Sequence, residues 1–167
     1  METLYKGKAT SIAVAVDGSE PGWEAFGRAI NMAKLLNLEM DVLFVVQLKK
    51  AGYFAFIDRH LQEEKEAIAR EVFAEAERRA QKAGVTLHTH LLESEADPAT
   101  EIVNFLDQAR GVKFLVIGSY GRGFKSRTIL GSTTEKVIRE IARRVIPVPV
   151  LVVPAVRSEP TAGETAD

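Results

Sequence analysis

Residues 114–134 read FLVIGSYGRGFKSRTILGSTT, and this stretch carries most of the fold prediction. The apolar run from Phe114 to Gly118 is followed by a glycine-rich segment and then by a helical pattern that starts near Ser132. Short apolar runs rich in β-branched residues and bounded by glycine are typical of buried strands. The stretch therefore predicts a buried strand that leads through a loop into a helix.

Four further apolar runs predict strands of the same kind, and helical patterns fill the intervals between them. The runs are Ser11 to Val16, Met40 to Val46, Val85 to Leu92 and Val148 to Val153. Strict alternation of strands and helices is typical of a parallel sheet that is covered by helices on both faces. The sequence therefore predicts a single-domain α/β fold with five strands and four helices.

Two of the helices have clear start signals. Ser19 is placed as an N-cap with Pro21 in the first turn, and Asp97 followed by Pro98 gives the same signal for the third helix. The second helix is long and highly charged, which is typical of a solvated helix face. The connection before it, residues 47–58, has no helix cap and is expected to be a long loop.

Composition limits the classes of function. The chain has 167 residues, with 22 basic and 23 acidic residues, so it offers no basic surface for nucleic acid. No apolar run could cross a bilayer, the N-terminus lacks the apolar core of a signal peptide, and cysteine is absent. We expect a cytoplasmic protein without nucleic-acid or membrane partners. Residues 1–156 are expected to form the domain, and the polar stretch 157–167 a disordered tail.

The segment from Gly118 to Thr134 has the features of an anion site. Glycines let a backbone approach a phosphate, and a helix N-terminus is positively polarised. The segment contains no acid and three cations, which are Arg122, Lys125 and Arg127. Four of its hydroxyl groups could donate to phosphate oxygens, and they belong to Ser126, Ser132, Thr133 and Thr134. The segment therefore predicts a phosphate site, and a solvated basic loop is the alternative.

Two common phosphate motifs do not fit this segment. A Walker A loop would need lysine directly after its last glycine, but Phe124 lies between Gly123 and Lys125. A dinucleotide fingerprint begins at Gly121 and Gly123, but Ser126 stands in place of its third glycine. That fingerprint also belongs after the first strand of a sheet, and here it follows the fourth.

The spacing Gly118-x2-Gly121-x9-Gly131-Ser132 resembles the nucleotide signature of the ATP-binding branch of the universal stress proteins. The run AVDGSEPGWEA at 15–25, the Asp97-Pro98 start and the closing Pro149-Val-Leu-Val-Val are also similar to that family. The resemblance covers roughly Lys8 to Val153. It implies an open sheet of order 3-2-1-4-5, in which the ends of strands one and four flank the ligand crevice.

The resemblance also implies roles for individual residues. Ala15 and Val46 match positions that wall an adenine, and Asp17 matches an acidic residue near the nucleoside, although Asp17 could also cap the turn that follows it. Backbone contacts to base and ribose are expected from Ile117 and Gly118. Phosphate contacts are expected from Gly121, Gly131, Ser132 and Thr133. The cations Arg122, Lys125 and Arg127 are added to the site on their charge alone.

Valine at position 131 is expected to fill the phosphate space while leaving the fold intact. No residue is assigned a catalytic role, and no protein metal site is expected, although Mg²⁺ could be held by the phosphates themselves. His88 and His90 share a strand face and could form half a metal site, but solvent-facing strand residues are favoured.

Three functions remain open. The favoured one is an ATP-binding regulator or sensor, because hydrolysis usually needs a positioned base that the sequence does not reveal. A slow ATPase and a nucleotide-independent dimeric stress protein are the alternatives. A homodimer is expected through the last strand, since Pro149-Val-Leu-Val-Val is strongly apolar and lies at the sheet edge in the implied order.

Overall fold

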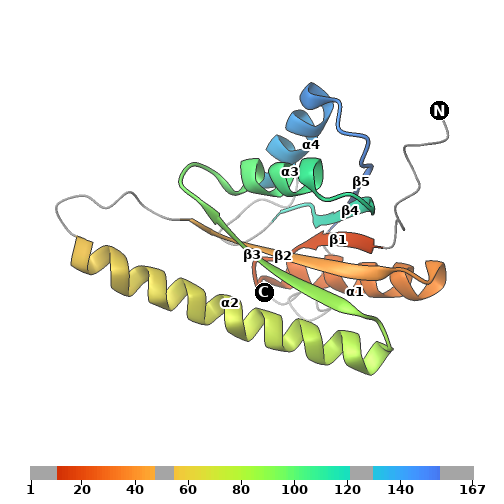
Figure 1. The fold of residues 1–167 in the computed structure, drawn as a ribbon, viewed down its shortest axis with the longest axis horizontal. Coiled ribbons are helices and arrows are strands. Elements are labelled where there is room, and N and C mark those ends of the chain that lie inside the picture. The colour runs from red at the N-terminus through yellow and green to blue at the C-terminus, as the bar shows by residue number, and fades with distance from the viewer. Residues whose placement is uncertain (1–10, 48–54, 121–129, 155–167) are drawn as a thin grey trace, which may run out of the picture.

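The structure of the chain is a computed structural model that describes residues 11–47, 55–120 and 130–154. Five parallel strands form one sheet in the order β3-β2-β1-β4-β5, as Figure 1 shows. The strands are β1 (Ser11–Ala15), β2 (Glu39–Gln47), β3 (Leu87–Ser94), β4 (Val112–Gly118) and β5 (Val150–Val153). The helices are α1 (Glu20–Leu36), α2 (Ala55–Ala83), α3 (Pro98–Gln108) and α4 (Ser132–Arg144). The predicted fold class and strand order are confirmed.

The sheet separates two apolar layers. Helices α1 and α2 cover one face, and α3 and α4 cover the other (Figure 1). Side chains alternate between the faces along β2, because successive residues of a strand point to opposite sides. Val42 and Phe44 thus join the layer of α1 and α2, whereas Leu43 joins the layer of α3 and α4. Phe26 and Leu115 are fully buried anchors of the two layers.

The predicted helix starts are confirmed, and the predicted loop before α2 is partly wrong. The Ser19 hydroxyl accepts a hydrogen bond from the Gly22 N–H, and the Asp97 carboxylate caps α3 in the same way. The expected loop over residues 47–58 is shorter, since Gln47 ends β2 and α2 already begins at Ala55. Neither glycine nor proline occurs between Ala55 and Ala83, so nothing in the backbone opposes an early helix start.

Two helices end in the same left-handed conformation with different residues. Asn37 ends α1 at a φ of 54°, and Val145 ends α4 at a φ of 55°. Asparagine visits this region easily, whereas a β-branched residue there costs about 1–2 kcal/mol. Val145 is also 83% exposed, so burial does not offset that cost. β5 follows at Val150, two residues later than the predicted start at Val148.

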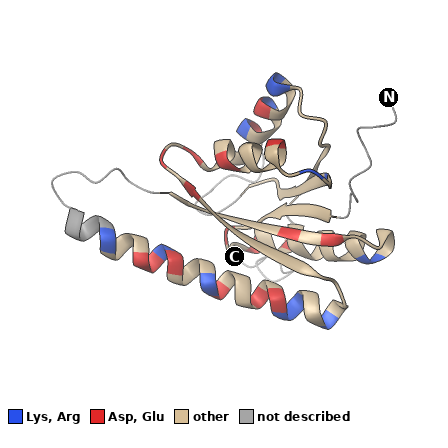
Figure 2. Ribbon diagram, in the orientation of Figure 1, with Lys and Arg blue, Asp and Glu red and all other residues tan. Residues whose placement is uncertain are grey.

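Charged residues of both signs recur along the described part of α2 (Figure 2). Glu75 holds two guanidinium groups, with its Oε1 2.7 Å from Arg78 Nη2 and 2.6 Å from Arg79 Nε. The hydrogen bond from Arg78, followed by that from Arg79, lowers the pKa of Glu75 to about 2. Arg79 also lies 4.4 Å above the Trp23 ring, which ties α2 to α1. This part of α2 therefore does more than face solvent.

Among the described residues, no helix is both long enough and apolar enough to cross a membrane. The predicted tail, residues 157–167, lies outside the described residues.

Candidate functional site

A cavity of about 410 Å³ opens at the carboxyl ends of the central strands. β1 and β4 are neighbours in the sheet, and the helices that follow them pass to opposite faces. Chains that diverge in this way leave a crevice at the point where the winding reverses. The ends of β1, β2 and β4 line the cavity together with residues from all four helices.

Every predicted site residue that the structure describes lines this one cavity. These residues are Ala15, Asp17, Val46, Ile117, Gly118, Gly131, Ser132 and Thr133. The remaining predicted residues, Gly121, Arg122, Lys125 and Arg127, lie outside the described parts of the chain. The structure thus brings the described set together, and the individual ligand roles stay predictions.

The start of α4 is fixed to the end of β4 by two hydrogen bonds. The Gly131 N–H donates to the Ser119 carbonyl at 2.7 Å, and the Thr134 hydroxyl donates to the Gly118 carbonyl at 2.8 Å. Thr134 is buried, so its hydroxyl proton is used within the protein. The expectation that this hydroxyl donates to a phosphate is therefore corrected.

The N-terminus of α4 has no side-chain cap. Gly131 occupies the N-cap position without a side-chain cap hydrogen bond, and the first helical bond runs from the Glu135 N–H to the Gly131 carbonyl at 2.9 Å. The N–H groups of the first helical turn have no partner within the helix. Ser132 and Thr133 belong to this turn and line the cavity, which therefore meets the positive end of the helix dipole.

Close backbone packing excludes a side chain at Gly131. A Cβ there would lie 2.9 Å from the Tyr120 Cα and 3.2 Å from the Ser119 carbonyl oxygen. The φ of Gly131 is −62°, which any residue adopts, so the requirement for glycine is purely steric. Valine at this position would thus displace the backbone around Tyr120. The expectation that valine would fill only the phosphate space and leave the fold intact is corrected.

Gly118, at the end of β4, is also tightly packed. A Cβ on Gly118 would lie 3.0 Å from the carbonyl oxygen of Pro21, in the first turn of α1. Contact at this distance leaves little room for any side chain, so glycine allows the end of β4 to approach α1 at the cavity wall.

Asp17 holds the turn between β1 and α1 and also lines the cavity. Its Oδ1 accepts hydrogen bonds from the Ser19 N–H at 3.0 Å and from the Ser19 hydroxyl. Gly22 packs against the carboxylate, because a Cβ there would lie 2.9 Å from Asp17 Oδ1. The turn-capping interpretation is therefore correct, and it is compatible with the predicted role near a nucleoside.

The other end of the cavity lies where β2 runs past β1. The last paired residues are Ala15 and Leu43, and the Val16 N–H donates to the Leu43 carbonyl at 3.0 Å. β2 then continues, paired with β3, as far as Gln47. Along a parallel strand, the N–H and C=O of one residue point to the same neighbouring strand, and those of the next residue point to the other. The N–H and C=O of Val45 and of Gln47 therefore face the β1 side, as those of Leu43 do. Beyond the end of β1, that side is the cavity.

The sequence did not reveal several residues that line the cavity. Lys65 and Ile68 come from α2, and Pro98 and Ile102 come from α3. Lys65 lies in a charged run that is typical of a solvated helix, so no local signal marks it. Pro98 could have been found, because the start of α3 follows β3 and must also lie at the carboxyl edge of the sheet.

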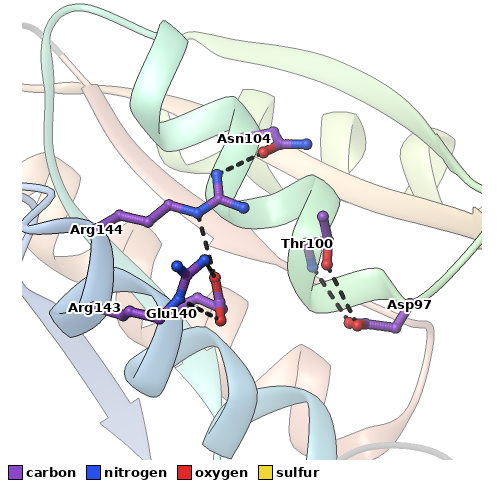
Figure 3. A network of polar contacts seen from close by, with 6 residues as sticks. All are labelled: Asp97, Thr100, Asn104, Glu140, Arg143 and Arg144. Carbon is purple, nitrogen blue, oxygen red and sulfur yellow. Dashed lines mark hydrogen bonds and ion pairs between the residues drawn. The ribbon is translucent and has the colours of Figure 1, made fainter.

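A polar network joins α3 and α4, the two helices that cover one face of the sheet (Figure 3). Arg144 of α4 donates to Glu140 Oε2 at 3.3 Å and to the Asn104 side-chain carbonyl of α3 at 2.8 Å. The hydrogen bond from Arg143, the largest of several effects, lowers the pKa of Glu140 below its ordinary value of 4.5. The network keeps α3 and α4 side by side behind the cavity.

The two histidines of β3 pair with acids of β2. Nε2 of His88 lies 2.7 Å from Glu39 Oε2, and Nε2 of His90 lies 2.7 Å from Asp41 Oδ1. His88 is exposed as predicted, whereas His90 is half-buried against Phe105. In the described parts of the chain, no three His, Cys, Asp or Glu residues are placed to hold a metal ion.

Comparison with known proteins gives a consistent family match. The model of the universal stress protein family matches residues 9–154. A universal stress protein of Methanocaldococcus jannaschii is 33% identical over 144 residues, which cover 83% of this chain and 78% of that protein.

Two solved structures have the same fold. Universal stress protein UspA from Lactobacillus plantarum has a TM-score of 0.72 and 26% identity, covering 87% of this chain and 98% of that one. The universal stress protein from Archaeoglobus fulgidus in complex with dAMP has a TM-score of 0.62 and 24% identity. That match covers 86% of this chain and 96% of the Archaeoglobus chain, and the bound dAMP is a property of that relative.

Proposed function

This chain belongs to the universal stress protein family, and on that premise we propose that it binds ATP and acts as a regulator or sensor. The observation that carries the proposal is the uncapped start of α4, whose first turn lines the cavity through Ser132 and Thr133. A phosphate would accept hydrogen bonds from the open N–H groups there and would complement the helix dipole. Adenine-nucleotide binding by a relative, which is solved with dAMP, supports the same assignment.

The end of β2 supports adenine as the base. In a parallel ladder, a neighbouring residue donates to one carbonyl and accepts from the N–H two residues later. Val45 and Gln47 offer such a carbonyl and N–H on the cavity side. The exocyclic amine and N1 of adenine form a matching donor and acceptor, whereas the corresponding edge of guanine has the donor and acceptor reversed. Apolar walls for the ring are supplied by Ala15, Val46, Ile68, Ile102 and Ile117.

The phosphates would face the start of α4 and the cationic segment that contains Arg122, Lys125 and Arg127. Mg²⁺ would be bound by the phosphates themselves, since this ion keeps much of its shell from water and phosphate oxygens. Slow hydrolysis is the alternative function. Release of inorganic phosphate from protein-bound ATP, measured at a single turnover, distinguishes an ATPase from a protein that only binds.

Calorimetric titration of the purified protein with ATP, AMP and GTP tests the proposal. ATP is expected to bind most tightly, because AMP lacks the phosphates that reach farther into the cationic segment and GTP presents the wrong base edge. Equal affinity for GTP, or for AMP, would contradict the assignment of a base pocket joined to a phosphate site. Absence of ATP binding would support a nucleotide-independent protein.

We also infer that two copies pair through β5. This strand lies at the edge of the sheet, and its Leu151 is 39% exposed. An apolar edge is commonly covered or paired, and a twofold copy would satisfy its backbone groups. Light scattering at micromolar concentration with ATP present is expected to give the mass of a dimer, and Leu151→Asp should lower that mass. A monomer mass for the unaltered protein would refute the dimer.

A further inference from the structure

Lys65 is a charged residue that reaches into the cavity from α2. Its Nζ donates a hydrogen bond to the Gln47 carbonyl at 2.9 Å. Among the described residues that line the cavity, Lys65 and Asp17 are the ones with charged side chains. Asp17 holds the turn after β1, whereas the partner of Lys65 is the last peptide of β2.

The position of Lys65 assigns it to the base end of the cavity. Its carbonyl partner belongs to β2, and β1 lies between β2 and β4 in the sheet. The open start of α4 follows β4, so the expected phosphate site is on the other side of β1 from Gln47. The Gln47 carbonyl lies on the edge of β2 that faces the cavity, next to the groups that we expect to read the base.

We propose that Lys65 is a positioning residue for the base, an inference that rests on the proposed binding of an adenine nucleotide. By holding the Gln47 carbonyl, the ammonium group fixes the end of β2 against α2. The carbonyl of Val45 and the N–H of Gln47 are then held at the spacing that adenine requires. Because Lys65 acts on the base end, its contribution does not depend on the number of phosphates in the ligand.

The experiment compares adenosine, AMP and ATP on the whole chain by calorimetry. Lys65→Met removes the donor while keeping most of the apolar stem, and we expect it to weaken binding of all three ligands by the same factor, about three- to tenfold. Lys65→Arg keeps a cationic donor and is expected to stay close to the unaltered protein. Lys82→Met, an exposed lysine in the last turn of the same helix, is the matched control and should change nothing.

Each other outcome contradicts the inference in a recognisable way. A loss for ATP that shrinks for AMP and disappears for adenosine would mean that Lys65 binds phosphate. Unchanged binding of all three ligands in Lys65→Met, or an equal loss in Lys65→Arg, would mean that the hydrogen bond to Gln47 does not matter. If the methionine variant melts well below the control, Lys65→Leu, which also lacks a donor, takes its place and is expected to give the same equal loss. Failure of the unaltered protein to bind any of the three would instead refute the proposed function.

Discussion

Helices α3 and α4 lie on the same face of the sheet and both begin at its carboxyl edge, but their N-termini are completed differently. At α3, Asp97 Oδ1 accepts from the Ala99 N–H at 2.9 Å and from the Thr100 N–H at 3.3 Å. Lys136 of α4 lies 3.6 Å from the other oxygen of the same carboxylate. At α4, Gly131 provides no side-chain cap at all.

The difference separates a structural helix end from one that is suited to a ligand. An N-cap side chain stabilises a helix by about 1 kcal/mol relative to alanine but by only a few tenths of that relative to glycine. The start of α4, with Gly131 as its N-cap, therefore leaves its N–H groups open at little cost in stability. Gly131 leaves the first N–H groups of α4 without a side-chain acceptor at the cavity, where a bound anion can accept hydrogen bonds from them. We therefore expect changes in the first turn of α4 to affect binding, and changes at the N-cap of α3 to affect stability.

Gly131→Ala should have the largest effect. The added Cβ meets the Tyr120 Cα, so the backbone between β4 and α4 must move and the open N–H groups move with it. We expect ATP affinity to fall at least tenfold, and the free energy of unfolding to fall by about 1–3 kcal/mol. Calorimetry measures the first effect, and urea denaturation the second.

Gly27→Ala is the matched control for that substitution. Gly27 lies inside α1, and a Cβ there would meet nothing within 4 Å. Alanine should therefore raise the free energy of unfolding by about 0.5–1 kcal/mol and leave ATP affinity unchanged. Equal behaviour of the two alanine variants would show that close packing at Gly131 is not what shapes the site.

Asp97→Ala should have an intermediate effect, on stability alone. The variant loses the cap of α3, and we expect the free energy of unfolding to fall by about 1 kcal/mol. Asp97→Asn keeps a capping side chain and should recover most of that loss. ATP affinity is expected to stay within about twofold in both variants, since Asp97 does not line the cavity. A loss of ATP affinity in Asp97→Ala without a loss of stability would contradict the assignment of a purely structural role to the start of α3.

Glu140→Gln should have the smallest effect, visible only in acid. The Arg143 and Arg144 hydrogen bonds lower the pKa of Glu140 in the folded protein, so its ionised form stabilises the fold above the ordinary value of 4.5. That contribution is lost as the pH falls from 4.5 through the lowered pKa. The glutamine variant should therefore lose less stability over this range. Urea denaturation at a series of pH values measures the free energy of unfolding. If that free energy falls as steeply below pH 4.5 in the variant as in the unaltered protein, the prediction is contradicted.

The strands, helices and α/β class could be predicted from the sequence because their signals are local and agree with one another, whereas the strand order was implied by the family resemblance. Apolar runs marked the strands, and the caps at Ser19 and Asp97 marked two helix starts to the residue. The end of α4 could not be placed, because Val145 adopts a conformation that its side chain disfavours. The start of α2 was missed because Ala55 has no capping residue before it that the pattern could detect.

Some residues that line the cavity were predicted and others were not, and the difference has a physical reason. Residues at strand ends, such as Asp17 and Gly118, could be placed because strand order brings the ends of neighbouring strands together. Lys65 and Ile102 reach the cavity through the packing of helices on the sheet, and periodicity alone does not fix that packing. The steric role of Gly131 depends on the path of Tyr120, which no sequence pattern specifies.

The lining of the cavity has a consequence for the cooperativity of the fold. Phe44 and Ile68 belong to the layer of α1 and α2, whereas Leu43 and Ile102 belong to the layer of α3 and α4, and all four line the same space. A molecule bound there would contact both layers, so local unfolding of either layer would require its release. Amide hydrogen exchange in both layers would then slow together, by the free energy that the ligand adds, about 2.7 kcal/mol at a hundred times its Kd.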